Sequence, residues 1–562
     1  MSYSALTRAV RPGVRLARGN SKEVFWVQLA EEFARSLQTM GVRYVFGIPG
    51  GPSIAFMDAI RRQGMEFILV SHEEAAGVMA DVTGRLTGVP GVCHATFGPG
   101  ATHLATGVGG ALLDRSPLIA FTTEVRPEDL DRKVQMNIDH QALFRPLTKW
   151  TTRLTEDNLT ETMTKAYQVA TAEVTGPVHI GVPSNLDTAA AEPPEGGYRF
   201  EKSAGGDPSP VALEQAFSLM SKARRPIVAL GLTAARRGCS AAIRRWIEKS
   251  RIPVVVTPMA KGVVPESHPC YAGALFHALS DRVADIYRQA DLVIGLGYDP
   301  IEFNYEQWMP KVPLVHIDTS KADITPDYDV ACEVVGDLVP ALEYLNARTW
   351  PVYQWDMAEI GENRKKVMDG LFPASTGFTP SQAIAVLQEV LPGDGILTAD
   401  VGAHLHLLGQ LWRSGEPNKL LMTNGWSSMG WGLPAALGAK LSRPEKTVVC
   451  VTGDGGFLMN CGELMTARRY GINTVTVVLC DHSLSLIEVK QERKNVPAYA
   501  TRLYKDDYFN AGSFLGVPVL RARDPGELKA ALLSAFAANG PVIIEATVDG
   551  ASYTDLIARS YK

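Results

Sequence analysis

The chain has 562 residues, enough for about three or four domains that each bury a core. Hydrophobic residues make up 46% and charged residues 20%, a composition that excludes a fibrous chain and bulk disorder. With 55 Lys and Arg against 60 Asp and Glu, the net charge is −5, so nucleic acid and anionic lipid are not expected as partners. No apolar run approaches the roughly 18 residues that a membrane span needs.

Cysteine usage and the first residues bear on the location of the protein. Seven cysteines are spread along the chain without the paired spacing of a metal or redox motif, which favours reduced thiols and a cytoplasmic protein. Residues 1–22 contain five basic and no acidic residues but lack the apolar centre of a signal peptide. We expect 1–22 to form a flexible tail, with a targeting presequence as the alternative.

Buried-strand patterns alternate with helical spacing along the chain, which predicts an α/β fold with mostly parallel sheets. Strands are expected at 44–48, 67–70, 91–96, 118–122, 178–182, 226–231, 252–257, 291–297, 314–318, 395–400, 447–452, 474–479 and 542–547. This series predicts three doubly wound domains and two linkers. The domains are placed at 23–190, 211–345 and 379–562, and the linkers at 191–210 and 346–378.

The strongest local signal for chemistry is a glycine-rich turn, Gly453-Asp454-Gly455-Gly456, which follows the strand at 447–452. Glycines let the backbone approach an oxyanion, and N–H groups at a helix start favour negative charge. Asp454 offers a hard oxygen to Mg²⁺. A tight turn with a helix-capping aspartate has the same sequence and is the alternative interpretation.

A second carboxylate follows the next strand. Asp481 lies 27 positions after Asp454 and just beyond the strand at 474–479. Because adjacent parallel strands place their carboxyl ends together, Asp454 and Asp481 are predicted to ligate one Mg²⁺, with Ser483 as a further candidate ligand.

The stretch from Gly453 to Asp481 resembles the thiamine-diphosphate signature, which begins Gly-Asp-Gly and usually ends in Asn, where this chain has Asp481. Further segments match the acetolactate-synthase branch of the pyruvate-oxidase-like enzymes in order and spacing; they are 46–51, 71–75, 98–103 and 424–434. The resemblance covers nearly the whole chain. It implies pyrimidine-binding, central and diphosphate-binding domains, with thiamine diphosphate and Mg²⁺ as cofactors.

The same resemblance places the active site between the first domain of one subunit and the third domain of another, so a homodimer or homotetramer is expected. The central segment 297–302 is similar to that of the flavin-free acetolactate synthases. Neither FAD nor NAD is therefore expected, and the third glycine of a dinucleotide fingerprint is missing after Gly295 and Gly297. A nucleotide site elsewhere in the central domain is the alternative.

Catalytic roles follow from the resemblance. Glu73 occupies the place of the glutamate that hydrogen-bonds the aminopyrimidine ring and promotes deprotonation of the thiazolium C2. Gln135 matches a glutamine near the substrate, and His103 replaces a common Asn as an acid/base group or a packed imidazole. An exposed polar helix start is the alternative for Glu73, and a solvated loop residue is the alternative for Gln135.

Cofactor contacts are implied in the same way. Met429 takes the place of the large apolar residue that holds the cofactor in its bent conformation, although a Met is also ordinary core filler. The carbonyl of Ser427 would accept a hydrogen bond from the 4′-amino group. The other expected cofactor contacts are Pro49, Gly50, Glu73, Gly402, Ala403, His404, Gly453, Asp454, Gly455, Gly456, Asp481 and Ser483.

The implied activity is decarboxylation of a 2-oxoacid coupled to carboligation, with acetolactate formation from pyruvate as the first hypothesis. Trp426, Trp431 and the stretch 483–491 do not follow the usual synthase pattern. A lyase or decarboxylase acting on 2-hydroxyketones or another 2-oxoacid is therefore the alternative. A catalytically silent, cofactor-binding regulatory protein is the alternative from a different class.

Overall fold

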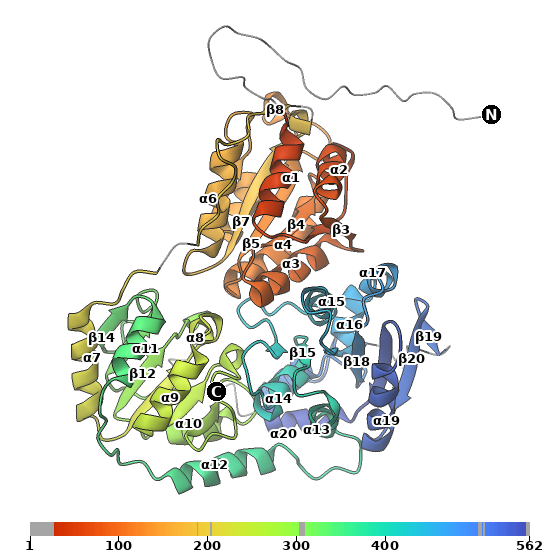
Figure 1. Ribbon diagram of the computed structural model, residues 1–562. Helices are drawn as coiled ribbons and strands as arrows, with labels where there is room; N and C mark the ends of the chain where they lie inside the picture. Colours follow the sequence, from red (N-terminus) through yellow and green to blue (C-terminus); the bar gives the residue numbers. More distant parts are fainter. Residues whose placement is uncertain are drawn as a thin grey trace.

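A computed structural model describes residues 27–187, 189–202, 205–302, 309–503, 509 and 512–557. The expected tail, 1–22, lies outside these residues. The described chain forms three α/β domains, each built on its own mostly parallel sheet, as the sequence predicts (Figure 1).

The N-terminal domain has a six-stranded parallel sheet in the order β3-β2-β4-β5-β7-β6. Its strands are β2 (Tyr44–Gly47), β3 (Glu66–Leu69), β4 (Gly91–Ala95), β5 (Leu118–Glu124), β6 (Trp150–Arg153) and β7 (Pro177–Pro183). Its helices are α1 (Leu29–Thr39), α2 (Ile54–Arg62), α3 (Glu73–Thr87), α4 (Pro99–Leu113), α5 (His140–Phe144) and α6 (Leu159–Thr171). A short antiparallel pair, β1 (Val27–Gln28) with β8 (Ala190–Ala191), joins the two ends of the domain.

The central domain has a parallel sheet in the order β11-β10-β9-β12-β13-β14. Its strands are β9 (Pro226–Leu230), β10 (Val254–Val256), β11 (Tyr271–Ala274), β12 (Leu292–Leu296), β13 (Leu314–Asp318) and β14 (Val330–Val335). Its helices are α7 (Pro210–Lys222), α8 (Leu232–Arg236), α9 (Ser240–Ser250), α10 (Ser280–Tyr287) and α11 (Leu338–Asn346). The segment 346–378, expected to be a linker, contains the helix α12 (Met357–Gly370), which runs beneath the central and C-terminal domains in Figure 1.

The C-terminal domain has the sheet order β16-β15-β17-β18-β21-β20-β19, parallel except for the hairpin β19-β20. Its strands are β15 (Ile396–Ala399), β16 (Leu420–Leu421), β17 (Val448–Gly453), β18 (Val475–Cys480), β19 (Ser513–Phe514), β20 (Val517–Ala522) and β21 (Val542–Thr547). Its helices are α13 (Pro380–Val390), α14 (Ala403–Leu411), α15 (Gly432–Ser442), α16 (Asp454–Asn460), α17 (Glu463–Arg469), α18 (Ser485–Arg493), α19 (Pro525–Phe536) and α20 (Tyr553–Ile557).

Local sequence explains where these elements begin and why the strands lie inside. The central strands β5, β9 and β12 are buried along their whole length, because helices cover both faces of a doubly wound sheet and both sets of side chains must be apolar. Helix α13 begins with a capping box in which Thr379 and Gln382 bond each other's backbone N–H, and Pro380 occupies its first turn.

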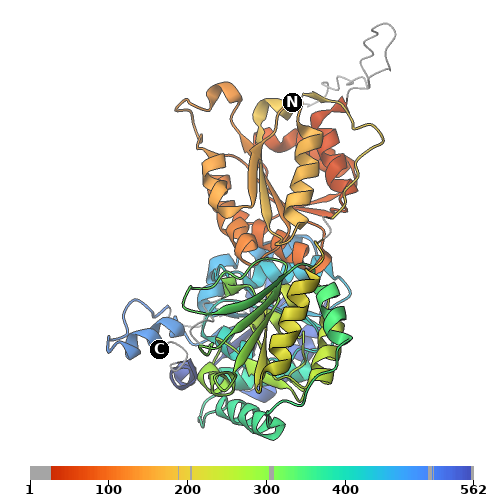
Figure 2. The ribbon, with the colours of Figure 1, turned by 90° about the vertical axis from the view of Figure 1, so that its left-hand side faces the viewer.

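The N-terminal domain sits on top of the other two domains in both views (Figures 1 and 2). Its helix α3 packs against α15 of the C-terminal domain. Gly438 makes this close approach possible, since a Cβ there would lie 2.9 Å from the Met79 carbonyl oxygen. Across the described residues, no helix is both long enough and apolar enough to cross a membrane.

Candidate active site

A pocket opens at the carboxyl edge of the C-terminal sheet, beyond the neighbouring strands β15, β17 and β18. It has a volume of ≈ 580 Å³, and we call it the sheet-edge pocket. Its lining contains most of the residues predicted to bind cofactor or metal: Gly402, Ala403, His404, Met429, Gly453, Asp454, Gly455, Gly456, Asp481 and Ser483. The parallel order of the strands therefore brings the separate motifs together.

Two carboxylates face this pocket without an ion pair to Lys or Arg among the described residues. Asp454, the first residue of α16, is 2% exposed; its Oδ1 accepts from Gly455 N at 2.8 Å and its Oδ2 from His482 N at 2.7 Å. Burial, followed by the charge of Asp481, raises the pKa of Asp454 to about 7. In the described chain neither Asp454 nor Asp481 forms an ion pair with Lys or Arg. A divalent cation would relieve this repulsion, so the carboxylates fit the predicted Mg²⁺ site.

Asp481 is held by the chain that follows it. Its Oδ1 accepts from Ser483 N at 3.1 Å and its Oδ2 from the Ser485 hydroxyl at 2.6 Å. Burial also raises the pKa of Asp481 above its ordinary value. A turn before α20 packs on the same carboxylate, since a Cβ on Gly550 would lie 2.7 Å from Oδ2, and Tyr553 then joins the pocket lining.

Two further polar atoms of the pocket lack a partner among the described residues. The Ser483 hydroxyl oxygen and His404 Nε2 are both buried without a hydrogen bond. Burial lowers the pKa of His404 to about 4, so its imidazole is neutral at neutral pH. Its ring lies over the glycine turns: a Cβ on Gly402 would be 2.8 Å, and one on Gly453 3.5 Å, from His404 Cε1. Buried polar atoms without a hydrogen bond, placed above glycine turns, suit an anionic ligand such as a diphosphate.

The loop 424–430 contributes Met429 to the pocket. The Met429 Cε methyl would be 3.3 Å from a Cβ placed on Gly455, so this side chain reaches the glycine-rich turn. Ser427 has a left-handed backbone with φ of 55°, and its hydroxyl donates to Asn424 O at 2.8 Å. Ser427 does not line the pocket, and the role predicted for its carbonyl stays a prediction.

The predicted catalytic residues form a second cluster, in the N-terminal domain. Glu73 is 7% exposed at the first position of α3, and its Oε2 lies 3.2 Å from His103 Nδ1. The rings of His72 and His103 stack with centroids 4.7 Å apart. We call Glu73, His72 and His103 the Glu73 cluster. A Cβ on Gly100 would lie 3.3 Å from Glu73 Oε1, so the turn that starts α4 leaves that oxygen room.

Gly50 and Gln135 lie on turns of the same domain. A Cβ on Gly50 would collide with the Thr96 hydroxyl at 2.3 Å, which explains a glycine in this turn. Gln135 is exposed, and its neighbour Met136 packs on the Gly98 turn, where a Cβ would lie 2.7 Å from Met136 O.

Within one chain the structure leaves the two halves of the predicted site apart. The residues that do not line the sheet-edge pocket are Pro49, Gly50, Glu73, His103, Gln135 and Ser427. An active site shared between two subunits, as the sequence predicts, would join such halves, and it stays a prediction.

Sequence reasoning missed several residues that contact these groups. Tyr553 and Ser485 belong to the sheet-edge pocket, and Glu463 contacts the backbone just before Glu73. No local motif marks Tyr553, 72 positions after Asp481. Glu463 carried one weak signal, because it stands nine positions after Asp454 of the glycine-rich turn.

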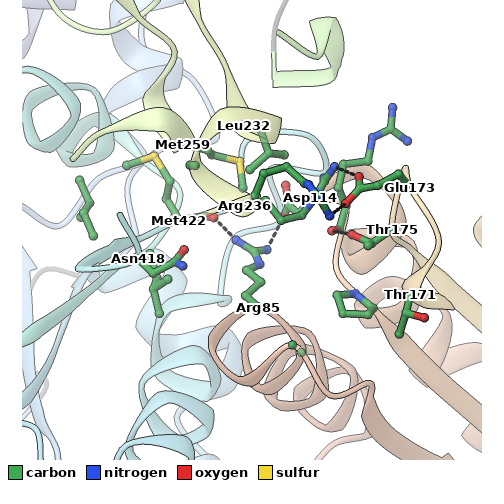
Figure 3. Close-up of a pocket in the computed structure, with 18 of the residues that line it drawn as sticks. Arg85, Asp114, Thr171, Glu173, Thr175, Leu232, Arg236, Met259, Asn418 and Met422 are labelled. Carbon is green, nitrogen blue, oxygen red and sulfur yellow. Dashed lines mark hydrogen bonds and ion pairs between the residues drawn. The ribbon is translucent and has the colours of Figure 1, made fainter. Parts of the chain in front are cut away.

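A larger pocket, of ≈ 870 Å³, lies where all three domains meet, and we call it the junction pocket (Figure 3). Arg85 of α3 reaches into it, donating to Asp81, to Asp114 Oδ2 at 2.7 Å and to Met422 O at 2.7 Å. Arg236 of the central domain pairs with Glu173 at 2.5 Å. Arg85 pairs with Asp114 of its own domain and also reaches the C-terminal domain at Met422 O, while Arg236 and Glu173 join the central and N-terminal domains, so this pocket acts as a structural junction.

Comparisons with known proteins agree with the geometry. The chain matches three family models, described as the N-terminal TPP binding domain, the central domain and the C-terminal TPP binding domain of thiamine pyrophosphate enzymes. The matches cover residues 27–143, 213–345 and 400–546, respectively.

Individual proteins align along nearly the whole chain. An acetolactate synthase of Bacillus subtilis is 30% identical over 552 residues, covering 94% of both chains. A probable acetolactate synthase large subunit of Methanocaldococcus jannaschii is 29% identical over 563 residues, covering 94% of this chain and 93% of its own. An acetolactate synthase large subunit of Haemophilus influenzae is 30% identical over 546 residues. Together with the three domains, these matches show that the chain belongs to the thiamine-diphosphate-dependent enzymes, as an acetolactate-synthase-like carboligase.

Proposed function

We propose that the protein is a cytoplasmic, Mg²⁺-dependent enzyme that decarboxylates pyruvate and joins the remaining two-carbon unit to a second pyruvate to give acetolactate. The observation that carries this proposal is the pair of a buried Asp454 and a half-buried Asp481, which line one pocket at a glycine-rich turn without a protein cation. The relatives named above are acetolactate synthases, which supports pyruvate as donor and acceptor.

The sheet-edge pocket is proposed to hold the diphosphate end of the cofactor. Asp454 and Asp481 would ligate Mg²⁺, and the Ser483 hydroxyl and His404 Nε2 would bond oxygens of the metal shell or the diphosphate. When bound, thiamine diphosphate supplies an electron sink for breaking and forming bonds next to a carbonyl. Leu484, Leu486 and Ile487 line the pocket beside it and give that part of the wall an apolar character.

The Glu73 cluster is proposed to manage the proton. The Glu73 carboxyl would share a proton with a ring nitrogen of the aminopyrimidine through one oxygen, while its Oε2 faces His103 Nδ1. Burial of Glu73 keeps bulk water from competing for that proton. A regulatory protein that only binds the cofactor has no need of a buried glutamate here, so the cluster favours an enzyme.

Two copies of the chain are proposed to complete each site. Exposed apolar side chains flank both halves, with Met459 60% and Leu458 42% exposed on α16, and Ile54 66% exposed near the Gly50 turn. Covering them in a homodimer or homotetramer would remove apolar surface from water. The partner's Glu73 cluster would then face the sheet-edge pocket.

Product analysis tests the activity. Purified protein with thiamine diphosphate and Mg²⁺ is given pyruvate, other 2-oxoacids or 2-hydroxyketones, and CO₂ and products are measured by mass spectrometry. Acetolactate from pyruvate supports the proposal, whereas turnover of another substrate alone assigns a different lyase or carboligase specificity. Glu73→Gln is the control: it should bind the cofactor without turnover, and unchanged turnover would remove Glu73 from catalysis.

Mixing two inactive variants tests the shared site. In a hybrid of Glu73→Gln with Asp454→Ala, one of the two sites combines the intact Glu73 of one chain with the intact Asp454 of the other. Random mixing of dimers should restore about a quarter of wild-type activity. If each chain contained its own complete site, mixing would restore none.

A further inference from the structure

We propose that Glu463 is a positioning residue for Glu73: a carboxylate of the C-terminal domain that fixes the start of helix α3 in the N-terminal domain. The proposal deepens the function given above, because its catalytic consequence rests on the role of Glu73. The contact itself is independent of that role.

The geometry is a buried carboxylate that receives three hydrogen bonds. Glu463 is 1% exposed, and its Oε1 accepts from Ser71 N at 2.9 Å and from His72 N at 3.0 Å. Its Oε2 accepts from the Thr466 hydroxyl at 2.7 Å. Burial raises the pKa of Glu463 to about 7, while these donors oppose that rise. Both oxygens are thus committed, and the side chain has one orientation.

The two backbone donors lie immediately before Glu73. His72 is the N-cap of α3, with its Nδ1 accepting from Glu74 N at 3.3 Å, and Glu73 is the first residue of the helix. N–H groups ahead of a helix have no partner within it. By accepting both hydrogen bonds, Glu463 fixes the direction in which the chain enters α3 and hence the backbone position from which the Glu73 side chain extends. A small displacement of this backbone lowers the rate of catalysis, because catalytic geometry tolerates little displacement.

The same interface contains a matched contact that does not touch the start of α3. Tyr470, which directly follows α17, accepts from Leu69 N at 2.8 Å and donates to Phe67 O at 3.2 Å, along the edge strand β3. Both Tyr470 and Glu463 hold the two domains together. Only Glu463 contacts the backbone that leads into Glu73, so the two can be separated by experiment.

The first test uses the protein without cofactor. Backbone amide hydrogen exchange is measured by mass spectrometry for peptides around residues 67–76 in wild type, Glu463→Ala, Glu463→Gln and Tyr470→Phe. Exchange at Ser71 and His72 should accelerate in Glu463→Ala, stay near wild type in Glu463→Gln, whose amide oxygen still accepts, and stay unchanged in Tyr470→Phe. Unchanged exchange at Ser71 and His72 in Glu463→Ala would overturn the proposal. If Glu463→Ala does not fold, Glu463→Asp, which withdraws the carboxylate but keeps its charge, replaces it.

The second test measures catalysis on the loaded enzyme. In Glu463→Ala, kcat and the exchange rate of the thiazolium C2 proton should fall on the order of 10- to 100-fold, with KM for thiamine diphosphate little changed. Glu463→Gln should recover most of the loss, and Tyr470→Phe should lower Tm without changing the C2 exchange rate. Equal losses of Tm in Glu463→Ala and Tyr470→Phe, with normal C2 exchange in both, would reduce Glu463 to a structural contact. Normal C2 exchange in Glu73→Gln would instead contradict the proposed function, leaving the amide result intact.

Discussion

The junction pocket and the sheet-edge pocket both bury carboxylates, but only the junction pocket supplies them with cations. Burial disfavours the charge of Arg85, yet the carboxylates of Asp81 and Asp114 hold its pKa above the ordinary value. At the sheet-edge pocket burial instead raises the pKa of both Asp454 and Asp481, and the charge of Asp481 raises that of Asp454 further. The larger pocket therefore has its charges neutralised within the fold, and the smaller one is left with a deficit of positive charge that a ligand can fill.

The largest expected effect comes from removing a carboxylate of the sheet-edge pocket. Asp454→Ala should abolish Mg²⁺-dependent binding of thiamine diphosphate. Turnover should fall by more than the roughly 10- to 100-fold that is typical when a residue that only hydrogen-bonds a metal ligand is replaced. The same change should raise the Tm of the apoenzyme, because it removes one of two like charges. Isothermal titration and thermal melting measure the two effects. A variant that still binds metal and cofactor normally would refute the assignment of the pocket.

The opposite sign of stability change is expected at the junction pocket. Arg85→Met should lower the free energy of unfolding by about 3–5 kcal/mol, because Asp81 and Asp114 would stay buried without their cation. Cofactor affinity of the folded protein should not change. The shift of the urea unfolding transition measures the loss, with Arg85→Lys as the variant that keeps the charge. A loss below about 1 kcal/mol would mean that this pair behaves like an exposed salt bridge.

The pH dependence of apoenzyme stability tests the charge of the sheet-edge pocket with Asp454→Asn, a variant that keeps the shape of the side chain. The pKa of Asp454 is about 7 in the folded protein and lies near 3.8 without burial, so the folded state binds the proton more tightly. Its contribution to stability is present below pH 3.8 and is lost as the pH rises towards 7. The pKa values of Asp400 and Glu463 are also raised, to about 6 and about 7, so the quantity to measure is the difference in Tm between wild type and Asp454→Asn.

Mg²⁺ provides the control for this titration. Saturating Mg²⁺ should make the difference in Tm between wild type and Asp454→Asn nearly independent of pH above pH 6, since a bound cation favours the ionised carboxylates. A difference in Tm that does not change between pH 5 and 8 in the absence of metal would contradict the charge deficit.

The strands inside each sheet were predicted from sequence more completely than the edge strands, of which β3 was expected at 67–70 but several others were missed. The strands expected at 314–318 and 542–547 coincide with β13 and β21, because strands buried on both faces are continuous apolar runs. The missed strands β6, β14 and β20 lie at or near sheet edges and are partly exposed, so their side chains mix apolar and polar residues. The missed edge strand β11 is buried but short and carries Gly273, which weakens a strand pattern.

The candidate site divides in a similar way. Asp454 was singled out from the local chemistry of its glycine-rich turn and Gly402 from the family resemblance, and the structure places both in the lining of the sheet-edge pocket. Glu463 contacts Ser71, which lies 392 positions earlier in the sequence, and Tyr553 lines the same pocket as Asp481, which lies 72 positions earlier. Only the packing of α17 on the start of α3, and of the Gly550 turn on Asp481, reveals them.

The smallest expected effect belongs to Asp481→Asn, which changes one charge and keeps the shape. The amide oxygen can still accept from Ser483 N and ligate Mg²⁺, so turnover at saturating Mg²⁺ should stay within about tenfold of wild type. The half-saturating Mg²⁺ concentration should rise, because one negative charge is lost, and the pKa of Asp454 should move down towards its ordinary value. Metal titration and the pH dependence of Tm measure these shifts. A loss as large as that of Asp454→Ala would mean that the metal needs both charges, and the usual Asn of the family could not serve in this pocket.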